Sequence, residues 1–430
     1  MLQGATPPAD RGRVVAVIIF VLGLGVLLPW NFFITATQYF NKRLAVPNVT
    51  SNGTHATKDY NYDSWMALLS QLPLLLFTLL NSFLYQWVRE RLRVAVSFTA
   101  IFVLFSLTAT LVHVPMHSDA FFSITMATIW FISSGAVLQG SLFGVVGLFP
   151  PAYSSLFMAG QGLAGMFAAV AMLFSILSNA DKRSAALGYF ITPCVATLGA
   201  LMCYLLLPHL EFARFHMNRS PSDEEKQQQL LCSKDRDVLE DAEVPEVTTQ
   251  TPPRSSVLAV FKKIWLMALC VTSVFAVTLS VFPAITVRVQ TVYEDNAAWV
   301  RVFTCVCCFI VFNAMDFAGR LAPSFVQWPS KDSKLFPGAI VSRLVFVPLL
   351  MLCNIEDSRL VVLFSHDLVF VVIMASFSFS NGYLATLCMA YAPQLVKSND
   401  CEMAGSLMSF FLVLGLALGA SLSFLLGTLV

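Results

Sequence analysis

The sequence predicts an all-α membrane protein with eleven transmembrane helices, in a major-facilitator-like arrangement of six helices followed by five. Of its 430 residues, 57% are hydrophobic and only 12% are charged, whereas a soluble domain usually carries about a quarter charged residues. The charges are bunched and leave apolar stretches of the roughly 20 residues that a helix needs to cross a bilayer. One long hydrophilic segment divides these stretches into two groups, which is the layout of carriers built from two helical bundles.

The apolar stretches set the positions of the spans. We expect them near residues 14–37, 64–87, 94–113, 120–148, 153–178, 185–207, 262–287, 299–320, 337–354, 366–392 and 402–428. The first stretch is too long for the apolar region of a signal peptide, so it is retained as a span. Two later stretches carry internal charges, Asp316 and Arg320 in one and Arg343 in the other. Both are kept, because residues 302–315 would otherwise expose a long apolar surface.

The hydrophilic segment sets the domain boundaries. Residues 1–208 form the predicted N-terminal six-helix bundle, and residues 257–430 form the C-terminal five-helix bundle. Residues 209–256 between them are rich in charge and glutamine and contain few aromatic residues. Such a composition cannot bury enough apolar surface to order itself. We therefore expect a disordered linker.

The orientation in the membrane is predicted from glycosylation motifs, because Lys and Arg residues are nearly balanced between the two sides. Asn48 and Asn52 begin two Asn-X-Thr acceptors in the loop of about residues 41–63. Glycans are added on the lumenal side, so this loop should face the outside of the cell. The N-terminus and the linker are then cytoplasmic. With eleven spans, the C-terminus is extracellular.

The motifs of enzymes and metal sites are not found in the sequence. It contains no HExxH, GxSxG or P-loop motif, and its six histidines are scattered. Most of the ten cysteines lie in apolar stretches, which is typical of buried packing thiols. The net charge of +1 does not indicate a nucleic-acid partner. We expect no catalytic residues, no metal and no cofactor.

Polar residues inside the predicted spans are candidate functional residues, because they are costly in lipid. Asp316 and Arg320 stand four residues apart and share one helix face. Two interpretations stay open for this pair: a structural ion pair, or a group that holds a polar solute. Gln139, Gln71 and Asn313 are further uncharged polar residues in spans. A cluster of such residues from both bundles would favour a solute cavity.

Trp30 and several glycine-rich segments permit both a structural and a functional interpretation. An indole at the end of a span, as at Trp30, often only anchors the helix at the interface. Glycines recur at residues 139–147, 160–165 and 415–419. Small residues four apart let helices approach closely in lipid. These segments are expected to pack helices, and the same contacts can also act as sliding surfaces.

Six motifs, in order along the chain, resemble those of the equilibrative nucleoside transporter family. They are LGLGVLLPWNFF (22–33), QGSLFG (139–144), GQGLAG (160–165), DFAGR (316–320), RLVFVP (343–348) and SNGYL (380–384). The resemblance covers nearly the whole chain outside the two hydrophilic loops and is greatest to the vertebrate plasma-membrane branch. Gln71 and the segment NSFLYQ (81–86) favour the member of that branch that also accepts nucleobases.

The resemblance implies roles for particular positions. The predicted substrate-binding residues are Trp30, Gln71, Gln139, Phe309, Asn313, Asp316, Arg320 and Leu416. Ile34 and Pro283 match an outer constriction, with Phe282 beside it, and Arg93 and Glu402 match an ion pair that closes the cytoplasmic side. The chemistry is suitable for a nucleoside. A Gln amide can pair with a base edge, a carboxylate beside a guanidinium can bind ribose hydroxyls, and aromatic rings can stack on the base.

The resemblance also implies a function. We expect a monomeric plasma-membrane protein that carries nucleosides of the adenosine, uridine and inosine class, and nucleobases, down their gradient by alternating access. Membrane lipid is its other expected partner. One alternative is a proton-coupled nucleoside carrier. Another, of a different class, is a membrane receptor that binds a ligand without moving it, although eleven spans argue against a seven-helix receptor.

Overall fold

The helices of the computed structural model follow the apolar stretches of the sequence. The structure describes residues 8–35, 40, 43–44, 48–49, 55–56, 62–84, 88–111, 114, 116–133, 135–177, 182–217, 256–356 and 358–429. The N-terminal bundle consists of α1 (Val14–Thr35), α3 (Tyr62–Leu84), α4 (Glu90–Leu111), α5 (Ser118–Ser133), α6 (Ala136–Val146), α7 (Pro151–Leu177) and α8 (Lys182–Leu206). The C-terminal bundle consists of α11 (Val257–Val281), α12 (Ala297–Phe303), α13 (Val311–Leu321), α14 (Leu335–Ser342), α15 (Phe346–Met351), α16 (Asp367–Tyr391) and α17 (Cys401–Gly427).

These helices account for all eleven predicted spans. Among the described residues, nine helical segments are long and apolar enough to cross a membrane. Two shorter apolar helices, Leu69–Phe83 and Leu335–Met351, lie at the positions of two further predicted spans. One predicted span is built from α5 and α6, and another from α12 and α13. Both spans with internal charges are therefore helical, as the sequence predicts.

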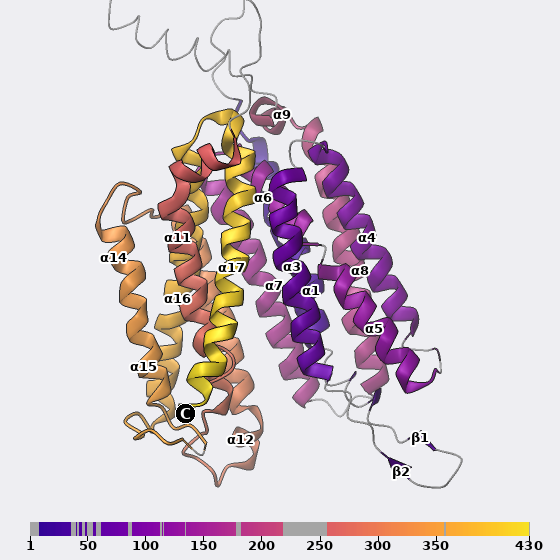
Figure 1. The fold of residues 1–430 in the computed structure, drawn as a ribbon, viewed down its shortest axis with the longest axis vertical. Coiled ribbons are helices and arrows are strands. Elements are labelled where there is room, and N and C mark those ends of the chain that lie inside the picture. The colour runs from indigo at the N-terminus through magenta and orange to yellow at the C-terminus, as the bar shows by residue number, and fades with distance from the viewer. Residues whose placement is uncertain are drawn as a thin grey trace, which may run out of the picture.

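The two bundles lie side by side in Figure 1, with the N-terminal bundle in violet and the C-terminal bundle in orange and yellow. Helix α9 (Glu211–Met217) lies at the upper end, which is also where α8 ends and α11 begins. We call this end the linker side. The C-terminus and the two short strands, β1 (Asn48–Val49) and β2 (His55–Ala56), lie at the opposite end. The predicted linker therefore starts with a short helix, and residues 218–255 lie outside the described part.

Glycines let pairs of helices pack with their backbones in contact. Gly23 of α1 and Gly160 of α7 each lie against the backbone of the other helix, so that a methyl group at either position would clash. Gly319 of α13 and Gly382 of α16 make the same reciprocal contact. Close approach through small residues holds helices together in lipid, because no hydrophobic force acts between them there. The predicted packing role of the glycine segment around Gly160 is confirmed.

Helix α7 joins the bundles along most of its length, because it runs antiparallel to the span made of α12 and α13. Contacts are made by Met158 with Arg320, Gly162 with Phe317, Gly165 with Asn313, Ala169 with Cys305, and Ile176 with Arg301. Between α12 and α13, residues Thr304–Ile310 form a π-helix. Such wide turns occur often at functional sites, and this one lies directly before Asn313 and Asp316.

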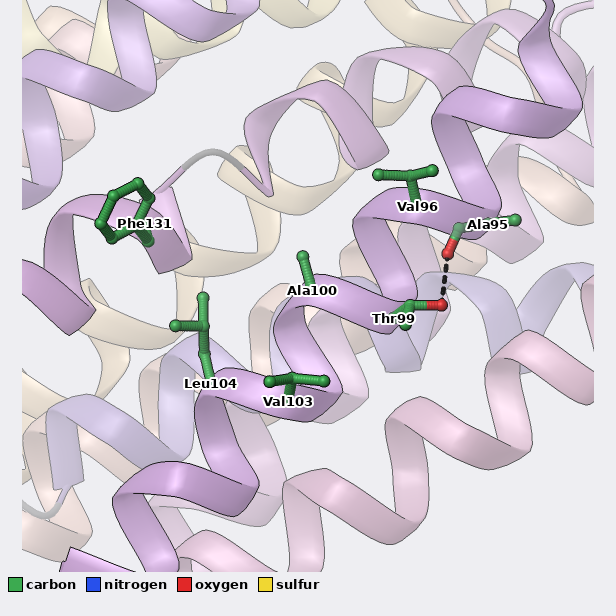
Figure 2. A pocket seen from close by; sticks show the side chains of 7 residues that line it. All are labelled: Ala95, Val96, Thr99, Ala100, Val103, Leu104 and Phe131. Carbon is green, nitrogen blue, oxygen red and sulfur yellow. Dashed lines mark hydrogen bonds between the residues drawn. The ribbon is translucent and has the colours of Figure 1, made fainter.

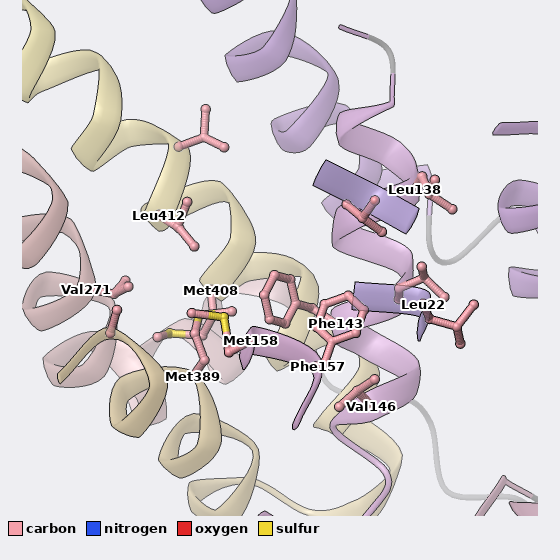
Figure 3. Close-up of a cluster of buried hydrophobic side chains, with 14 of the residues drawn as sticks. Leu22, Leu138, Phe143, Val146, Phe157, Met158, Val271, Met389, Met408 and Leu412 are labelled. Atoms are coloured by element: carbon pink, nitrogen blue, oxygen red, sulfur yellow. The ribbon is translucent and has the colours of Figure 1, made fainter. Parts of the chain in front are cut away.

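The apolar core differs between the two ends. One buried cluster contains side chains of both bundles, and Figure 3 shows Phe143 and Met158 of the N-terminal bundle near Met389 and Met408 of the C-terminal bundle. A second cluster, further from the linker side, is drawn from the C-terminal bundle alone, and a third from the N-terminal bundle alone. Within the described part of the chain, the bundles therefore share a core towards the linker side and have separate cores towards the other end.

Candidate functional site

The two charged residues of α13 form a buried ion pair. Arg320 Nε donates to Asp316 Oδ2 at 2.6 Å, and their side chains are 10% and 5% exposed. The four-residue spacing places both side chains on one face of the helix, as the sequence predicts. An ion pair in a low-dielectric site is stable only when further hydrogen bonds satisfy its remaining groups.

Other helices supply those hydrogen bonds. Asn381 of α16 donates from Nδ2 to Asp316 Oδ1 at 2.7 Å, and Arg320 Nη1 lies 3.4 Å from the Met158 carbonyl of α7. Among the described residues, Arg320 Nη2 has no hydrogen-bond partner. The pair therefore has its charge balanced within the protein, and one guanidinium nitrogen of Arg320 is left without a partner in the described part of the chain.

A second buried arginine is connected to this pair through two polar side chains. The Thr278 hydroxyl lies 2.7 Å from Asn381 Oδ1 and accepts from Arg343 Nη2 at 2.9 Å. Arg343 also donates to Ser380 Oγ at 3.1 Å and to the Val274 carbonyl at 2.8 Å, and it is 1% exposed. We call the group Asp316, Arg320, Asn381, Thr278, Arg343 and Ser380 the Asp316 network. It connects α11, α13, α16 and the turn that follows α14.

Most of the Asp316 network is missing from the residues predicted from sequence. Ser380 and Asn381 belong to the SNGYL motif and Arg343 to the RLVFVP motif, but none of these three residues, nor Thr278, is among the predicted site residues. An amide and an arginine within apolar stretches are signals that could have pointed to Asn381 and Arg343. The groups that Asn381 and Arg343 contact lie on other helices, so no local sequence pattern predicts the network.

Four of the predicted binding residues form a stripe along one span. Phe309, Asn313, Asp316 and Arg320 recur at intervals of three and four residues, which places them on one face. Asn313 Nδ2 donates to the Phe309 carbonyl at 2.9 Å, and its Oδ1 lies against Gly165 of α7. Asn313 and Arg320 therefore contact α7 of the N-terminal bundle, whereas Asp316 and Phe309 contact the C-terminal bundle.

The other predicted binding residues lie on separate helices. Trp30 of α1 stacks on Phe33 with ring centres 6.2 Å apart, and Leu416 of α17 packs on the shared core. Gln139 of α6 is 8% exposed, and Gln71 of α3 has a buried Oε1 without a hydrogen-bond partner. No hydrogen bond between described residues joins any of these four to Asp316 or Arg320. The two glutamines thus keep amide groups that a solute could bind.

The residues of the predicted outer constriction are only partly brought together. Phe282 stacks on Phe312 with ring centres 3.7 Å apart and meets Phe309 edge-on at 5.9 Å. Pro283 follows α11 and is exposed. Ile34 lies in α1, but its side chain is outside the described part of the structure.

The predicted cytoplasmic ion pair does form at the linker side. Arg93 Nη2 of α4 donates to Glu402 Oε1 of α17 at 2.5 Å, with side-chain exposures of 3% and 18%. Asn81 of α3 donates to Ser406 of α17 at 2.9 Å and accepts from Ser141 of α6 at 3.2 Å. We call these residues, together with Ser82, the linker-side latch. It connects three helices of the N-terminal bundle to one helix of the C-terminal bundle.

Close packing surrounds the latch. Gly144 of α6 lies against Glu402, and Gly405 of α17 lies against the Phe143 backbone, so that larger residues would push the two helices apart. The latch is therefore both a polar and a steric seal between the bundles at this end. Removing one partner of such a buried ion pair typically costs roughly 3–5 kcal/mol.

A groove on the outer surface of the N-terminal bundle differs from this site. It has a volume of about 550 Å³ and is lined by Ala95, Val96, Thr99, Ala100, Val103, Leu104 and Phe131 (Figure 2). The Thr99 hydroxyl is already bonded to the Ala95 carbonyl at 2.8 Å. Because the lining offers no free polar group, the groove suits an apolar chain and not a polar solute.

The glycosylation motifs lie in a loop that is only partly described. Asn48 is the first residue of β1, and β1 pairs with β2 in an antiparallel hairpin. Asn52 lies outside the described residues. The hairpin is at the end of the molecule opposite the linker side (Figure 1), as expected if the linker and this loop face opposite sides of a membrane.

Comparison with known proteins adds to this geometry. Residues 125–428 match the family model described as nucleoside transporter. The chain is 49% identical to human equilibrative nucleoside transporter 2, over 97% of this chain and 98% of that protein. It is 44% identical to human equilibrative nucleoside transporter 1, over 97% and 98%. It is 33% identical to equilibrative nucleoside transporter 3 of Rattus norvegicus, over 98% and 90%.

Solved structures with little sequence identity share the fold. The proton:xylose symporter XylE of the major facilitator superfamily aligns with a TM-score of 0.61 at 9% identity, over 98% of this chain and 89% of that one. The human organic anion transporter TETRAN aligns with a TM-score of 0.56 at 13% identity, over 96% and 92%. The predicted major-facilitator-like fold of a multi-pass membrane protein is confirmed.

Proposed function

The chain belongs to the equilibrative nucleoside transporter family, and from this we propose that it carries nucleosides across a membrane down their concentration gradient. The observation that carries the proposal is the Asp316–Arg320 pair. It is buried where α13 meets α16 and α7, its charge is balanced, and one guanidinium nitrogen has no partner among the described residues. A polar solute without net charge suits such a group.

The proposed binding chemistry divides the nucleoside into two parts. Asp316 and Arg320 accept from and donate to the ribose hydroxyls, because a carboxylate and a guanidinium make strong hydrogen bonds to such groups. Gln139 pairs with an edge of the base, as glutamine does when it reads nucleic acid bases. Trp30 and Phe309 stack on the base, a contact worth about 1–3 kcal/mol. Asn313, Gln71 and Leu416 complete the site.

The proposed transport cycle is alternating access. The linker-side latch is the inner gate, with Arg93 and Glu402 as its charged pair. Ile34, Phe282 and Pro283 form the outer constriction. The shared core towards the linker side, with separate cores towards the other end, supports a conformation that is closed on the cytoplasmic side. Breaking the latch would let the bundles part there and release the solute.

The charge balance of the site supports transport that does not depend on an ion gradient. A proton-coupled carrier needs an acid or histidine that gains and loses a proton within the membrane. Asp316 accepts hydrogen bonds from both Arg320 and Asn381 at 2.6 and 2.7 Å. Both carboxylate oxygens are thus occupied by donors of the protein, and Asp316 supplies the counter-charge of Arg320. The proton-coupled alternative is therefore the less favoured one.

We also propose the membrane, the oligomeric state, the orientation and the substrates of the protein. It lies in the plasma membrane as a monomer, with the N-terminus and linker in the cytoplasm and the C-terminus outside. The substrates are purine and pyrimidine nucleosides such as adenosine, uridine and inosine. Nucleobases are included because Gln71 and the segment NSFLYQ (81–86) resemble the family member that also accepts them.

The test is transport by the purified protein in proteoliposomes. Labelled uridine and hypoxanthine are supplied with and without an imposed pH gradient. We expect both to enter until the inner and outer concentrations are equal, whatever the gradient. Accumulation well above the outer concentration, abolished by a protonophore, would overturn the equilibrative mechanism. Absence of uridine entry would overturn the substrate assignment.

A further inference from the structure

Two carboxylates, one on each bundle, lie near the buried guanidinium of Arg93. Glu402 belongs to the C-terminal bundle and pairs with Arg93 at 2.5 Å. Glu90 belongs to the same helix as Arg93 and lies one turn before it, on the same face. Glu90 interacts electrostatically with both Arg93 and Glu402. Among the described residues, however, no ion pair joins Glu90 to Arg93.

Glu90 is held in place by the bundle to which it belongs. The Tyr204 hydroxyl of α8 donates to Glu90 Oε1 at 2.6 Å, and Tyr204 is 2% exposed. Helices α4 and α8 pack against each other within the N-terminal bundle. Glu90 will therefore stay beside Arg93 whatever the C-terminal bundle does.

The guanidinium of Arg93 has an unused donor. Its Nη2 is bonded to Glu402 and its Nη1 lies 3.5 Å from Asn81 Oδ1. Its Nε is buried and has no hydrogen-bond partner. A buried arginine with an unsatisfied donor is unusual, because such a group loses its hydration without compensation. The free Nε means that Arg93 can gain a partner without first losing one.

Opening the linker side would remove the present partner of Arg93. Glu402 and Ser406 are both on α17 and would move with the C-terminal bundle, while Arg93, Asn81 and Glu90 stay together. An arginine left in a low-dielectric site without a counter-charge is strongly unfavourable. If nothing replaced Glu402, this cost would oppose every opening of the latch.

We propose that Glu90 replaces Glu402 as the counter-ion of Arg93 when the linker side opens, with Tyr204 holding Glu90 in position for the exchange. The inference rests on the proposed alternating-access function. It makes Glu90 a positioning residue that stabilises the open linker side, whereas Glu402 stabilises the closed one. The two carboxylates therefore act on the conformational equilibrium in opposite directions, although both are acids near the same arginine.

The test measures how often the linker side opens. Ser82 is fully buried and lies 3.5 Å from Ser406 across the latch, so opening exposes it. A Ser82→Cys reporter in the purified full-length protein is labelled with a charged maleimide in nanodiscs, without substrate. Labelling of the peptide that contains this position is read by mass spectrometry, which separates it from the native cysteines. Every variant also carries the Ser82→Cys substitution, and its labelling is compared with that of the protein in which Ser82→Cys is the single change.

Opposite shifts are expected for the two acids. Glu90→Gln should lower the labelling rate roughly three-fold or more, and Glu402→Gln should raise it by a similar factor. In the double variant Arg93 has no counter-ion in either the open or the closed state. The labelling rate should therefore return towards that of the protein that carries the reporter alone. Tyr204→Phe should lower the rate less than Glu90→Gln, and Glu90→Asp should restore most of it. Glu211→Gln, an exposed acid at the same end, is the matched control and should change nothing.

The result that overturns the proposal is equal or faster labelling in Glu90→Gln than in the reporter. If that variant does not fold, a labelling rate in Tyr204→Phe equal to that of the reporter protein would overturn the proposal instead. Uridine transport by the wild-type protein, measured in parallel, keeps the two hypotheses apart. Transport without the predicted labelling shifts would refute the exchange of partners alone. The predicted shifts without uridine transport would refute the substrate and leave the exchange intact.

Discussion

At the scale of single residues, the buried charged groups within the spans are stabilised because side chains and carbonyls of several helices form hydrogen bonds with them. Asp316 is satisfied by α13 and α16, and Arg343 donates to groups on both α11 and α16. Each arginine uses the fixed fork of its guanidinium, which lysine cannot reproduce. In the proposed function the same residues have two roles: they hold the C-terminal bundle together, and through Arg320 they present a donor to the solute.

Variants of the Asp316–Arg320 pair should show that its contribution to stability differs from its contribution to transport. Asp316→Asn and Arg320→Ala each leave one buried charge without its partner, which costs roughly 3–5 kcal/mol. We expect both to lower the melting temperature and to reduce uridine transport strongly, Arg320→Ala more than Asp316→Asn. The double variant, which contains no unpaired charge, should recover much of the melting temperature but no transport. Recovery of transport in the double variant would show that the pair does not bind the solute.

Arg343 should be a structural residue that lysine cannot replace. Its three guanidinium nitrogens reach Ser380, Val274 and Thr278 at 2.8–3.1 Å. A lysine amine cannot reach all three, and each lost hydrogen bond to a charged group costs about 1.5–3 kcal/mol. Arg343→Lys should lower the melting temperature in detergent, measured by a thiol-independent fluorescence assay. The exposed Arg359 is the matched control, and an equal loss in Arg359→Lys would contradict this explanation.

At the scale of helices, the position of α13 is determined by glycines that contact the backbone of the neighbouring helix. Gly319 lies against the Phe379 carbonyl of α16, and Gly382 of α16 lies against the Asp316 carbonyl. These contacts bring Asn381 within hydrogen-bond distance of Asp316. The π-helix of Thr304–Ile310 then changes the register before Asn313. Local backbone features thus decide which polar groups meet.

Adding one methyl group at Gly319 should disturb the site. Gly319→Ala forces α13 away from α16, and such overpacking typically costs about 1–3 kcal/mol. We expect lower stability and weaker uridine transport. Gly338 of α14 is the matched control, because no other group lies within 4 Å of a Cβ added there. Gly338→Ala should be neutral or stabilising, since alanine favours helices over glycine by roughly 1 kcal/mol. Equal effects of the two substitutions would contradict the packing argument.

At the scale of the whole molecule, the two ends have different roles. Helix α7 remains against the α12–α13 span over its length, whereas α3 and α6 meet α17 through the latch on the linker side. The α7 contact can serve as the line about which the bundles rock. In the proposed transport cycle, an ion pair, two further polar contacts and glycine packing then determine how readily the linker side opens.

The orientation of the molecule can be tested through its glycans. If the loop with Asn48 and Asn52 is extracellular, an N-glycosidase should lower the apparent mass of the protein expressed in animal cells. The variant in which both asparagines are replaced by glutamine should show no such shift. A shift that persists in this variant would place the glycan elsewhere and contradict the predicted topology.

Much of the fold follows from the sequence because its signals are local. A span needs a continuous apolar stretch of fixed length, and all eleven predicted stretches are helical in the structure. The pair Asp316–Arg320 is also local, since four residues make one helical turn. The ion pair Arg93–Glu402 joins residues 309 positions apart, and only resemblance to a family made that pair a candidate.

The sequence by itself therefore determined the number of spans, the two bundles and the polar residues that lipid would not tolerate. The tertiary structure decided which of those residues meet. Asn81 and Ser406 are 325 residues apart, Asn381 and Asp316 are 65 apart, and Glu90 reaches Tyr204 across 114. Hydropathy cannot encode such pairs, because it measures only the transfer of each residue from water to lipid. Once helices are in the membrane, glycine contacts and complementary polar groups choose their neighbours.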